Sequence, residues 1–350
     1  MVKLVQIGLG GWGRNWAEEV LPTVPGIEMV AFVDADPAMR KLAAAKLKLE
    51  DARLFGSLDE AVIATRPEAA LVVVPLAAHA TVARDVLTHG LHALVEKPFT
   101  ETLGEAKALI EQAATGGLCL MVNQNYRHFP APLTFRRLVA EGELGHVGSI
   151  AVDFWKLFDE NYRYFFLAEP LLSDMAIHHF DLMRFILDDE PVAVSTMSWS
   201  EPETPYEGRP AAAALIRFAK GVVVSYRGTW ISRGPDTVWG ADWRIDGSKA
   251  AALGTFRGNA GDRRGEDRVT VYGKADSAKP ATLDASPFTD RAGALAGFRD
   301  WVQTGQAKPG LSTAADNLQS LALMHAAILS AAEGGRLVSI AEIMAREASA

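Results

Sequence analysis

Near its N-terminus, this 350-residue chain has a glycine-rich turn between an apolar run and a helical stretch, a pattern that few folds accommodate. The apolar run 4–7 leads into Gly8-Leu9-Gly10-Gly11-Trp12-Gly13, and residues 14–21 are typical of a helix. In such a GxGxxG turn, one glycine makes the bend, one admits a pyrophosphate, and one lets helix and strand pack closely. The N-terminal N–H groups of the helix then face the phosphates. We therefore expect a dinucleotide site with five cofactor-binding residues here: Gly8, Gly10, Gly11, Trp12 and Gly13.

An acidic residue at the end of the second apolar run supports this interpretation. Residues 28–33 are typical of a buried strand, and Asp34 follows, 21 residues past Gly13. That is close to the spacing of an acid that bonds the adenosine ribose hydroxyls. Because a carboxylate there repels a 2′-phosphate, we expect NAD to be preferred. Arg40, slightly further on, leaves NADP possible.

Apolar runs alternate with helical stretches through residues 1–124. Further strands are expected at 54–55, 70–74, 92–96 and 119–123, with helices at 38–49 and 79–89. Buried strands separated by helices predict a parallel sheet covered on both faces, which is a Rossmann domain when the dinucleotide motif is included. Residues just past the carboxyl ends of such strands line the ligand crevice. This rule adds four expected cofactor contacts: Pro75, His79, Glu96 and Lys97.

After residue 124 the pattern changes to strands joined by short turns. Strands are expected at 148–158, 211–218, 222–230, 241–246, 250–253 and 268–273, with loops at 201–210 and 259–268 and a long amphipathic helix at 313–333. Short connections predict a mostly antiparallel sheet. The expected fold class is therefore α/β, with a Rossmann domain at 1–124 and an α+β domain at 125–350.

A polar stripe in the second domain is the candidate for proton transfer. Residues 173–182 are typical of a helix with Ser173 as its N-cap. Asp174, His178 and Asp181 follow at i, i+4 and i+7 and would share one face, so that a carboxylate can orient the imidazole. A solvated Asp/His surface would show the same pattern, and on the residues alone both interpretations stay open.

Several of these motifs together resemble the Gfo/Idh/MocA oxidoreductases, the family of glucose–fructose oxidoreductase and inositol dehydrogenase. The specific part is Glu96-Lys97-Pro98 combined with the Asp/His helix. Asn125-Tyr126-Arg127 resembles the family's entry into the second domain, and residues 243–248 resemble its later hairpin.

The resemblance implies that Lys97, Asp174 and His178 are catalytic and that the peptide after Lys97 is cis. It also implies a large open sheet in the second domain, through which the chain would form a homo-oligomer, a dimer or tetramer. We add Asn125 to the cofactor contacts. For the substrate we expect five contacts: Lys97, Trp155, Asp174, His178 and His179.

The implied activity is hydride transfer between nicotinamide and a secondary alcohol of a sugar or a cyclic, inositol-like polyol. Two alternatives within the fold stay open: an NAD-recycling glycoside hydrolase or eliminating enzyme, and a non-catalytic nucleotide sensor. A sensor ranks last because the three catalytic positions are present.

Composition and charge exclude several classes of protein. A net charge of −8 argues against a nucleic-acid partner, and no apolar run approaches the length of a membrane span. The N-terminus has no pattern of a signal peptide, and the single Cys119 needs no oxidising compartment, so we expect a cytoplasmic protein. Adjacent His178 and His179 point apart on a helix, and there is no HExxH or CxxC. We therefore expect no metal.

Overall fold

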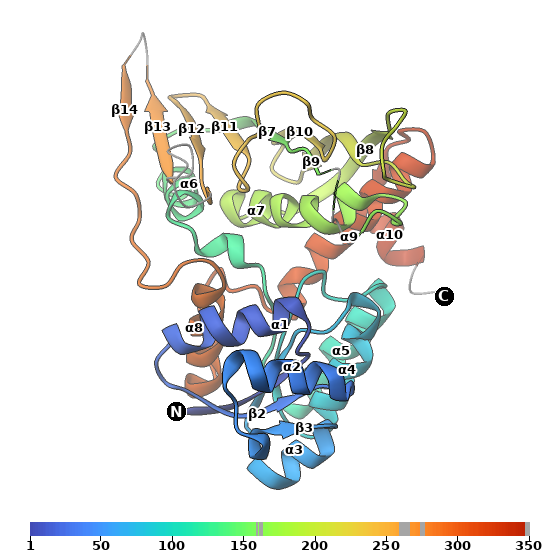
Figure 1. Cartoon of the computed structure of the whole chain (residues 1–350). Coiled ribbons are helices and arrows are strands. Elements are labelled where there is room, and N and C mark those ends of the chain that lie inside the picture. Colours follow the sequence, from blue (N-terminus) through green and yellow to red (C-terminus); the bar gives the residue numbers. More distant parts are fainter. Residues whose placement is uncertain (159, 161–163, 259–266, 274–276, 347–350) are drawn as a thin grey trace. The chain divides into compact units, whose positions relative to one another are not determined.

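The computed structural model describes residues 1–158, 160, 164–258, 267–273 and 277–346 (Figure 1). These residues form two compact units. The first contains Met1–Asn125 and Pro287–Leu318, and the second contains Tyr126–Ser286 and the chain from Gln319 onward. The expected division at residues 124 and 125 therefore differs from the structure in one long segment, because 287–318 folds with the first unit.

The first unit is built on a six-stranded parallel sheet in the order β3-β2-β1-β4-β5-β6. The strands are β1 (Val2–Ile7), β2 (Ile27–Val33), β3 (Leu54–Phe55), β4 (Ala69–Val72), β5 (His92–Val95) and β6 (Leu120–Val122). The order reverses beside β1, which places the end of β1 at the switch point where doubly wound sheets bind ligands. The expected parallel sheet is confirmed.

Helices flank this sheet in the usual alternation. They are α1 (Gly11–Asn15), α2 (Pro37–Leu47), α3 (Leu58–Thr65), α4 (Leu76–Thr88), α5 (Leu103–Gly116) and α8 (Asp290–Thr304), and a π-helical and a 3₁₀ turn extend α1 to Thr23. Local capping explains two starts: Ser57 caps α3, and Thr102 forms a capping box with Glu105 at α5. Helices α5 and α8 were not anticipated from the sequence.

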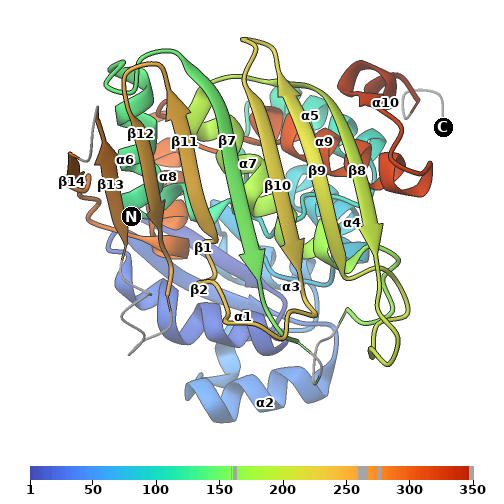
Figure 2. The same cartoon turned by 90° about the horizontal axis from the view of Figure 1, so that it is seen from above.

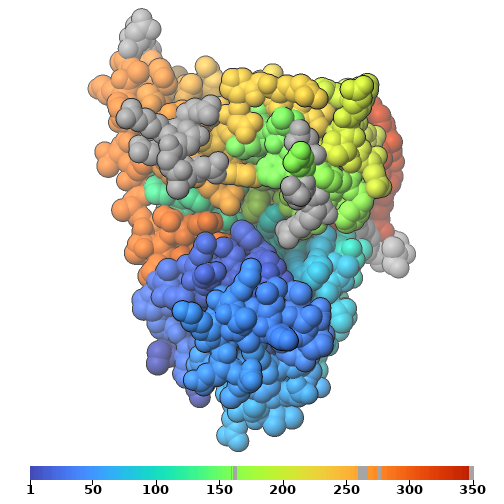
Figure 3. Space-filling view, in the orientation of Figure 1, coloured from blue at the N-terminus to red at the C-terminus, as the bar shows by residue number. Residues whose placement is uncertain are grey.

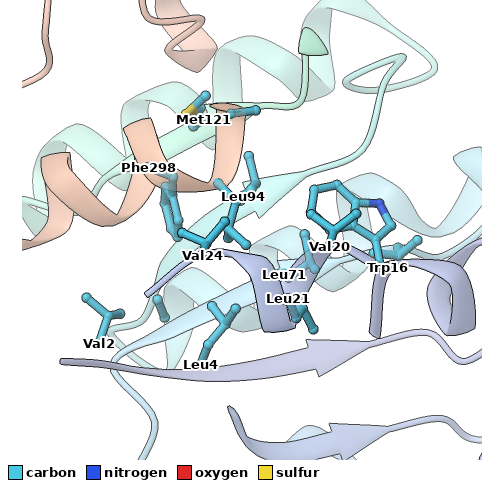
Figure 4. Packing of buried hydrophobic residues seen from close by; sticks show 14 of the residues in the cluster. Val2, Leu4, Trp16, Val20, Leu21, Val24, Leu71, Leu94, Met121 and Phe298 are labelled. Carbon is cyan, nitrogen blue, oxygen red and sulfur yellow. The ribbon is translucent and has the colours of Figure 1, made fainter. Parts of the chain in front are cut away.

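The core of the first unit explains why α8 belongs to it. Phe298 of α8 belongs to one apolar cluster with Leu94 and Met121 of the sheet and with Val24, which follows the first helical segment (Figure 4). Burying an aromatic side chain contributes roughly 2 kcal/mol, so this contact helps to hold a segment that is distant in sequence. The N-terminal residues form the blue surface of the unit in Figure 3.

The second unit contains a nine-stranded sheet in the order β14-β13-β12-β11-β7-β10-β9-β8-β15. The strands are β7 (Val147–Trp155), β8 (Pro191–Trp199), β9 (Ala211–Phe218), β10 (Val223–Thr229), β11 (Asp242–Gly247), β12 (Ala251–Thr255), β13 (Arg268–Tyr272), β14 (Ala278–Pro280) and β15 (Val338–Ser339). Among the described strands of this sheet, only β7 and β10 pair in parallel, so the expected mostly antiparallel sheet is confirmed. Strand β8 was not anticipated, and most of the loop expected at 259–268 lies outside the described residues.

Helices cover one face of this sheet and leave the other open (Figure 2). The covering helices are α6 (Pro130–Ala140), α7 (Ile177–Leu187) and α9 (Ala314–Ala332), and α10 (Ile340–Arg346) packs beside β8. Alternation along β7 buries Val152 and Phe154 on the covered side. Among the described residues, no helix is long and apolar enough to cross a membrane.

Candidate functional site

The glycine turn has the geometry of a cradle for a dinucleotide. A Cβ added at Gly8, where φ is +100°, would lie 2.1 Å from the carbonyl oxygen of Val73, and one added at Gly13 would lie 2.1 Å from that of Gly8. These two glycines are therefore required by packing. An added Cβ at Gly10 or Gly11 would meet nothing within 4 Å. This open space at the start of α1 suits a pyrophosphate.

Two side chains fix the backbone of the glycine turn through hydrogen bonds to its carbonyl oxygens. The buried amide of Gln6 donates to the carbonyl oxygens of Gly8, at 3.0 Å, and Gly13, at 2.7 Å. The guanidinium of Arg14 donates to the carbonyl oxygen of Leu9 at 2.6 Å. The carbonyl groups of the turn are thus occupied by the protein itself, which fixes the backbone of the cradle.

Asp34 lies against the same turn, as its spacing predicts. Its Oδ2 accepts from the backbone N–H of Leu9 at 2.8 Å, and its Oδ1 accepts from that of Asp36 at 3.0 Å. Each carboxylate oxygen has lone pairs beyond these bonds for ribose hydroxyls. Arg40 donates to the carbonyl oxygens of Asp34 and Ala35 at 2.6 and 3.1 Å, so its guanidinium braces this loop.

Pro75 and His79, two expected cofactor contacts at the start of α4, differ in solvent exposure. Pro75 is the exposed N-cap of α4. His79 is buried, with Nδ1 2.8 Å from the carbonyl oxygen of Pro98 and Nε2 3.0 Å from that of Val74. Both of its ring nitrogens therefore face the backbone. This favours a bracing role for His79 over the expected direct contact with the cofactor.

Glu96 is the centre of the hydrogen-bond network in the first unit. It is 5% exposed, and its Oε1 accepts from the indole N–H groups of Trp12, at 2.9 Å, and Trp16, at 2.7 Å. The amide of Asn123 donates to the same oxygen at 3.0 Å, and the backbone N–H of Lys97 donates to Oε2 at 3.2 Å. Both oxygens of this carboxylate are engaged by the protein, which favours a bracing role for Glu96 over the expected direct contact with the cofactor.

Lys97 follows at the carboxyl end of β5 and is partly exposed. The Lys97–Pro98 peptide is cis, as the family resemblance implies. Asn125, the last expected cofactor contact, is buried, and its amide donates to the carboxylate of Asp290 at the start of α8. Its side chain therefore holds α8 in the described structure.

The Asp/His helix of the second unit begins earlier than expected. A π-helical segment runs over Leu171–Ala176, and α7 starts at Ile177. The N–H of Ser173 bonds the carbonyl oxygen of Glu169, so the interpretation of Ser173 as an N-cap is wrong. Asp174 lies in the π-helical turn and His178 in the first turn of α7. Residues at i and i+4 share a face in an α-helix, and the π-helical segment that holds Asp174 changes that spacing.

His178 is held flat against an aromatic ring. Its imidazole stacks on Tyr126, with ring centroids 4.2 Å apart and an angle of 10° between the planes. The hydroxyl of Tyr126 accepts from the guanidinium of Arg257 and donates to the carbonyl oxygen of Trp239 at 3.3 Å. Arg257 also lies over the Tyr126 ring, 4.9 Å from its centroid. The roles of Tyr126 and Arg257 could not be predicted from the sequence, because no local pattern marks a contact between residues so far apart in the chain.

His179 lies in the interior of the second unit. It is completely buried, its Nδ1 is 3.3 Å from the hydroxyl of Tyr226, and its ring packs against Phe154 and Trp243. Removal from water lowers the pKa of His179 to about 3, so the ring is neutral at neutral pH. These surroundings favour a packing role over the expected contact with substrate.

Trp155 is also placed differently from expectation. It alternates with Phe154 on β7 and therefore lies on the open face of the sheet, where the guanidinium of Arg227 is 5.5 Å from its ring centroid. Phe154, on the other face, contacts His179. Trp155 thus belongs to the surface opposite α7. Of the other tryptophans in the unit, Trp230 and Trp243 are buried, and Trp239 is partly exposed.

Asp181, on the next turn of α7, is part of a buried ion-pair network. Arg127 donates to both carboxylate oxygens at 2.6 Å, and Ser320 donates to Oδ1 at 2.7 Å. Arg184 reaches the same carboxylate at 3.8 Å and bonds Ser320 at 2.8 Å. The network joins α7 to α9 and to the segment that carries Tyr126. Asp181 therefore has a structural role.

In the part of the chain that the structure describes, no group of three His, Cys, Asp or Glu side chains is arranged to hold a metal ion. Cys119 is buried, and desolvation raises the pKa of its thiol to about 11, which makes the thiolate scarce at neutral pH.

The open cradle at Gly10 and Gly11, with Asp34 at the end of β2, fits a bound dinucleotide. The protein is an oxidoreductase with an NAD-binding Rossmann domain. More particularly, the chain belongs to the Gfo/Idh/MocA family. The family model described as "Oxidoreductase family, NAD-binding Rossmann fold" matches residues 2–124, and the family's C-terminal domain model matches residues 133–279.

Individual relatives agree with this assignment. The chain is 30% identical over 348 residues to D-apiose dehydrogenase of Rhizobium rhizogenes, with 92% of each chain covered. It is 26% identical over 201 residues to scyllo-inositol 2-dehydrogenase (NAD(+)) of Bacillus subtilis, covering 55% of this chain and 56% of the relative. An oxidoreductase from Agrobacterium radiobacter, crystallised with NAD+, L-tartaric acid and magnesium, shares the fold: its TM-score is 0.83 at 21% identity, with 97% of this chain and 98% of that chain covered.

Proposed function

We propose that the protein oxidises a secondary alcohol of a sugar or cyclic polyol reversibly, with NAD as the hydride acceptor. The carrying observation is the imidazole of His178, which is nearly buried and fixed against Tyr126, in a chain that also has a dinucleotide cradle. The carbohydrate class is supported by relatives named D-apiose dehydrogenase and scyllo-inositol 2-dehydrogenase. The glycoside-cleaving and sensor alternatives gain no support from these names.

Three side chains are proposed to carry the chemistry. The bound nicotinamide supplies hydride transfer. His178 acts as general base and takes the hydroxyl proton, and Asp174, from the π-helical segment before α7, orients His178 as the family resemblance implies. Lys97 donates a hydrogen bond to the reacting oxygen and stabilises the negative charge that develops there. The stacked ring of Tyr126 supports this assignment, because a base must be held in a fixed orientation to accept a proton efficiently.

The position of Asp34 supports a preference for NAD over NADP. Its carboxylate is fixed by two backbone N–H groups beside the glycine turn, where a 2′-phosphate would be repelled. Calorimetric titration of the purified protein with NADH and NADPH should give the lower dissociation constant for NADH. A lower value for NADPH would assign the nearby Arg40 to the 2′-phosphate instead.

The activity is tested by the absorbance of reduced nicotinamide, with NAD and a panel of inositols, pentoses and hexoses. An increase in NADH absorbance with one compound is the expected result. If no compound of the panel produces NADH, in protein shown to bind NAD, the proposed substrate class is contradicted. Release of a cleaved product without net NADH would instead support cofactor recycling.

We also propose that the open sheet face joins copies of this chain. It presents large exposed apolar residues on neighbouring strands, including Met197 (65% exposed) on β8 and Leu215 (59%) on β9. Exposed apolar patches of this kind mark association sites. Light scattering after gel filtration should show a dimer or tetramer. Met197→Lys with Leu215→Lys should give monomers, and a monomeric wild-type protein would overturn this proposal.

A further inference from the structure

The carboxylate of Glu96 joins two parts of the first unit that are distant in sequence. One is the glycine turn with its following helical segment, which carries Trp12 and Trp16. The other is the segment that follows β5 and carries Lys97. Oε1 accepts both indole N–H groups and Oε2 accepts the main-chain N–H of Lys97.

Only one of the two indoles is accessible to a ligand. Trp12 is 39% exposed and lies in the turn between the open positions at Gly10 and Gly11 and the packed Gly13. Trp16 is completely buried. The guanidinium of Arg291, from α8, lies 4.2 Å from the Trp12 ring centroid and 5.2 Å from that of Trp16. The Trp12 indole is therefore fixed at its N–H by Glu96 and supported by a cation against its ring.

We propose that Glu96 is a positioning residue that couples occupancy of the dinucleotide cradle to the placement of Lys97. A ligand in the cradle lies against the backbone of the turn that carries Trp12. Any adjustment of that turn is transmitted through one buried carboxylate to the main chain at Lys97. The inference rests on the proposed catalytic role of Lys97.

The Glu96→Gln variant tests this with minimal change in shape. A carboxamide has one acceptor oxygen and one donor NH₂ group, so it cannot accept from both the indoles and the Lys97 N–H. Whichever way it is turned, an N–H donor faces another N–H. Trp12→Phe removes one donor and keeps an aromatic ring, and serves if Glu96→Gln does not fold. Glu105→Gln is the matched control, because Glu105 accepts a backbone N–H in the capping box of α5.

The main readout needs no substrate. The rate of acetylation of Lys97 is measured by mass spectrometry across pH, with and without ADP-ribose, which fills the cradle but has no nicotinamide to shield the lysine. In wild-type protein and Glu105→Gln, ADP-ribose should change this rate about threefold or more. In Glu96→Gln the change should disappear, while calorimetry still shows ADP-ribose binding.

Two results would overturn the proposal: no effect of ADP-ribose on Lys97 in the wild-type protein, or an undiminished effect in Glu96→Gln. With an active substrate, Glu96→Gln should also lower kcat about tenfold while the KM for NAD changes little. Because labelling requires no turnover, a wrong substrate class leaves the labelling result intact. A failure of the proposed function is thereby distinguished from a failure of the coupling.

Discussion

The imidazole of His178 lies parallel to the phenol ring of Tyr126, with 4.2 Å between the ring centroids and 10° between the planes. Tyr126 is in turn anchored at its hydroxyl by Arg257 and the carbonyl oxygen of Trp239. The proposed base is therefore oriented by a ring contributed from 52 residues earlier in the chain. Stacked aromatic pairs contribute about 1 kcal/mol, enough to favour one ring orientation several-fold.

Two substitutions at Tyr126 separate the ring from its hydroxyl. Tyr126→Leu removes the stack and should lower kcat about tenfold, since misorientation of a base by a fraction of an ångström is costly. Tyr126→Phe keeps the stack and should lose less. Steady-state kinetics with folding checked by circular dichroism would measure both. Equal losses in the two variants would mean that the hydroxyl, and not the stack, is what matters.

Replacing either proposed catalytic side chain with alanine should greatly lower turnover and leave the affinity for NAD nearly unchanged. Lys97→Ala and His178→Ala should each lower kcat by about 100-fold or more, because general acid–base groups contribute that much. Calorimetry should show NAD affinity within a few-fold of wild type. Lys41→Ala, an exposed lysine on α2, is the control. Near-normal turnover in either catalytic variant would end its assignment.

Among the glycines of the cradle, we expect substitution of one kind to lower stability and substitution of the other to lower the affinity for NAD. Gly13→Ala places a Cβ 2.1 Å from the carbonyl oxygen of Gly8 and should lower the melting temperature by several degrees. Gly10→Ala meets nothing within 4 Å, so the protein should fold normally but bind NAD less tightly. Thermal unfolding and calorimetry measure the two effects. Unchanged NAD affinity in Gly10→Ala would argue against a pyrophosphate in that space.

The buried ion pair on α7 should matter for stability. Asp181→Asn leaves the buried Arg127 without its carboxylate and should cost about 3 kcal/mol in the free energy of unfolding. Asp188→Asn is the control at the end of the same helix, where the carboxylate pairs with Arg136 while 79% exposed, and should cost less than about 1 kcal/mol. Urea unfolding compares them. Similar losses would contradict the structural role given to Asp181.

His179 should make the protein sensitive to acid. Its pKa is about 3 in the folded chain and 6.5 as an ordinary histidine, so between these values the unfolded chain binds one more proton. Stability should therefore fall as pH decreases below 6.5, by about 1.4 kcal/mol per pH unit from this group. Unfolding in urea at pH 7 and pH 5 tests this. His179→Gln should show a shallower pH dependence than wild type, and the surface variant His146→Gln serves as control.

Local sequence was sufficient for the parallel strands of the first unit and for the glycine turn. The GxGxxG turn is a local pattern, and Asp34 lies against it at 25 residues from Leu9, because the two parallel strands that precede them end at the same edge of the sheet. Strand β8 was missed because Ser195, Thr196 and Ser198 weaken its apolar alternation. Helix α8 was missed although it completes the first core, since nothing in its own segment shows that Phe298 would pack against a sheet formed far earlier in the chain.

Strand–helix alternation and short turns predicted the parallel and antiparallel character of the two sheets, and the glycine motif predicted the class of cofactor. Tertiary structure decided what each polar residue touches. In the folded chain, Glu96 and His79 bond to the protein itself, and His179 is buried. Trp155 lies on the open face of the sheet. The physical reason is that periodicity and turn chemistry are local, whereas burial and hydrogen bonding depend on partners that only the folded chain brings together.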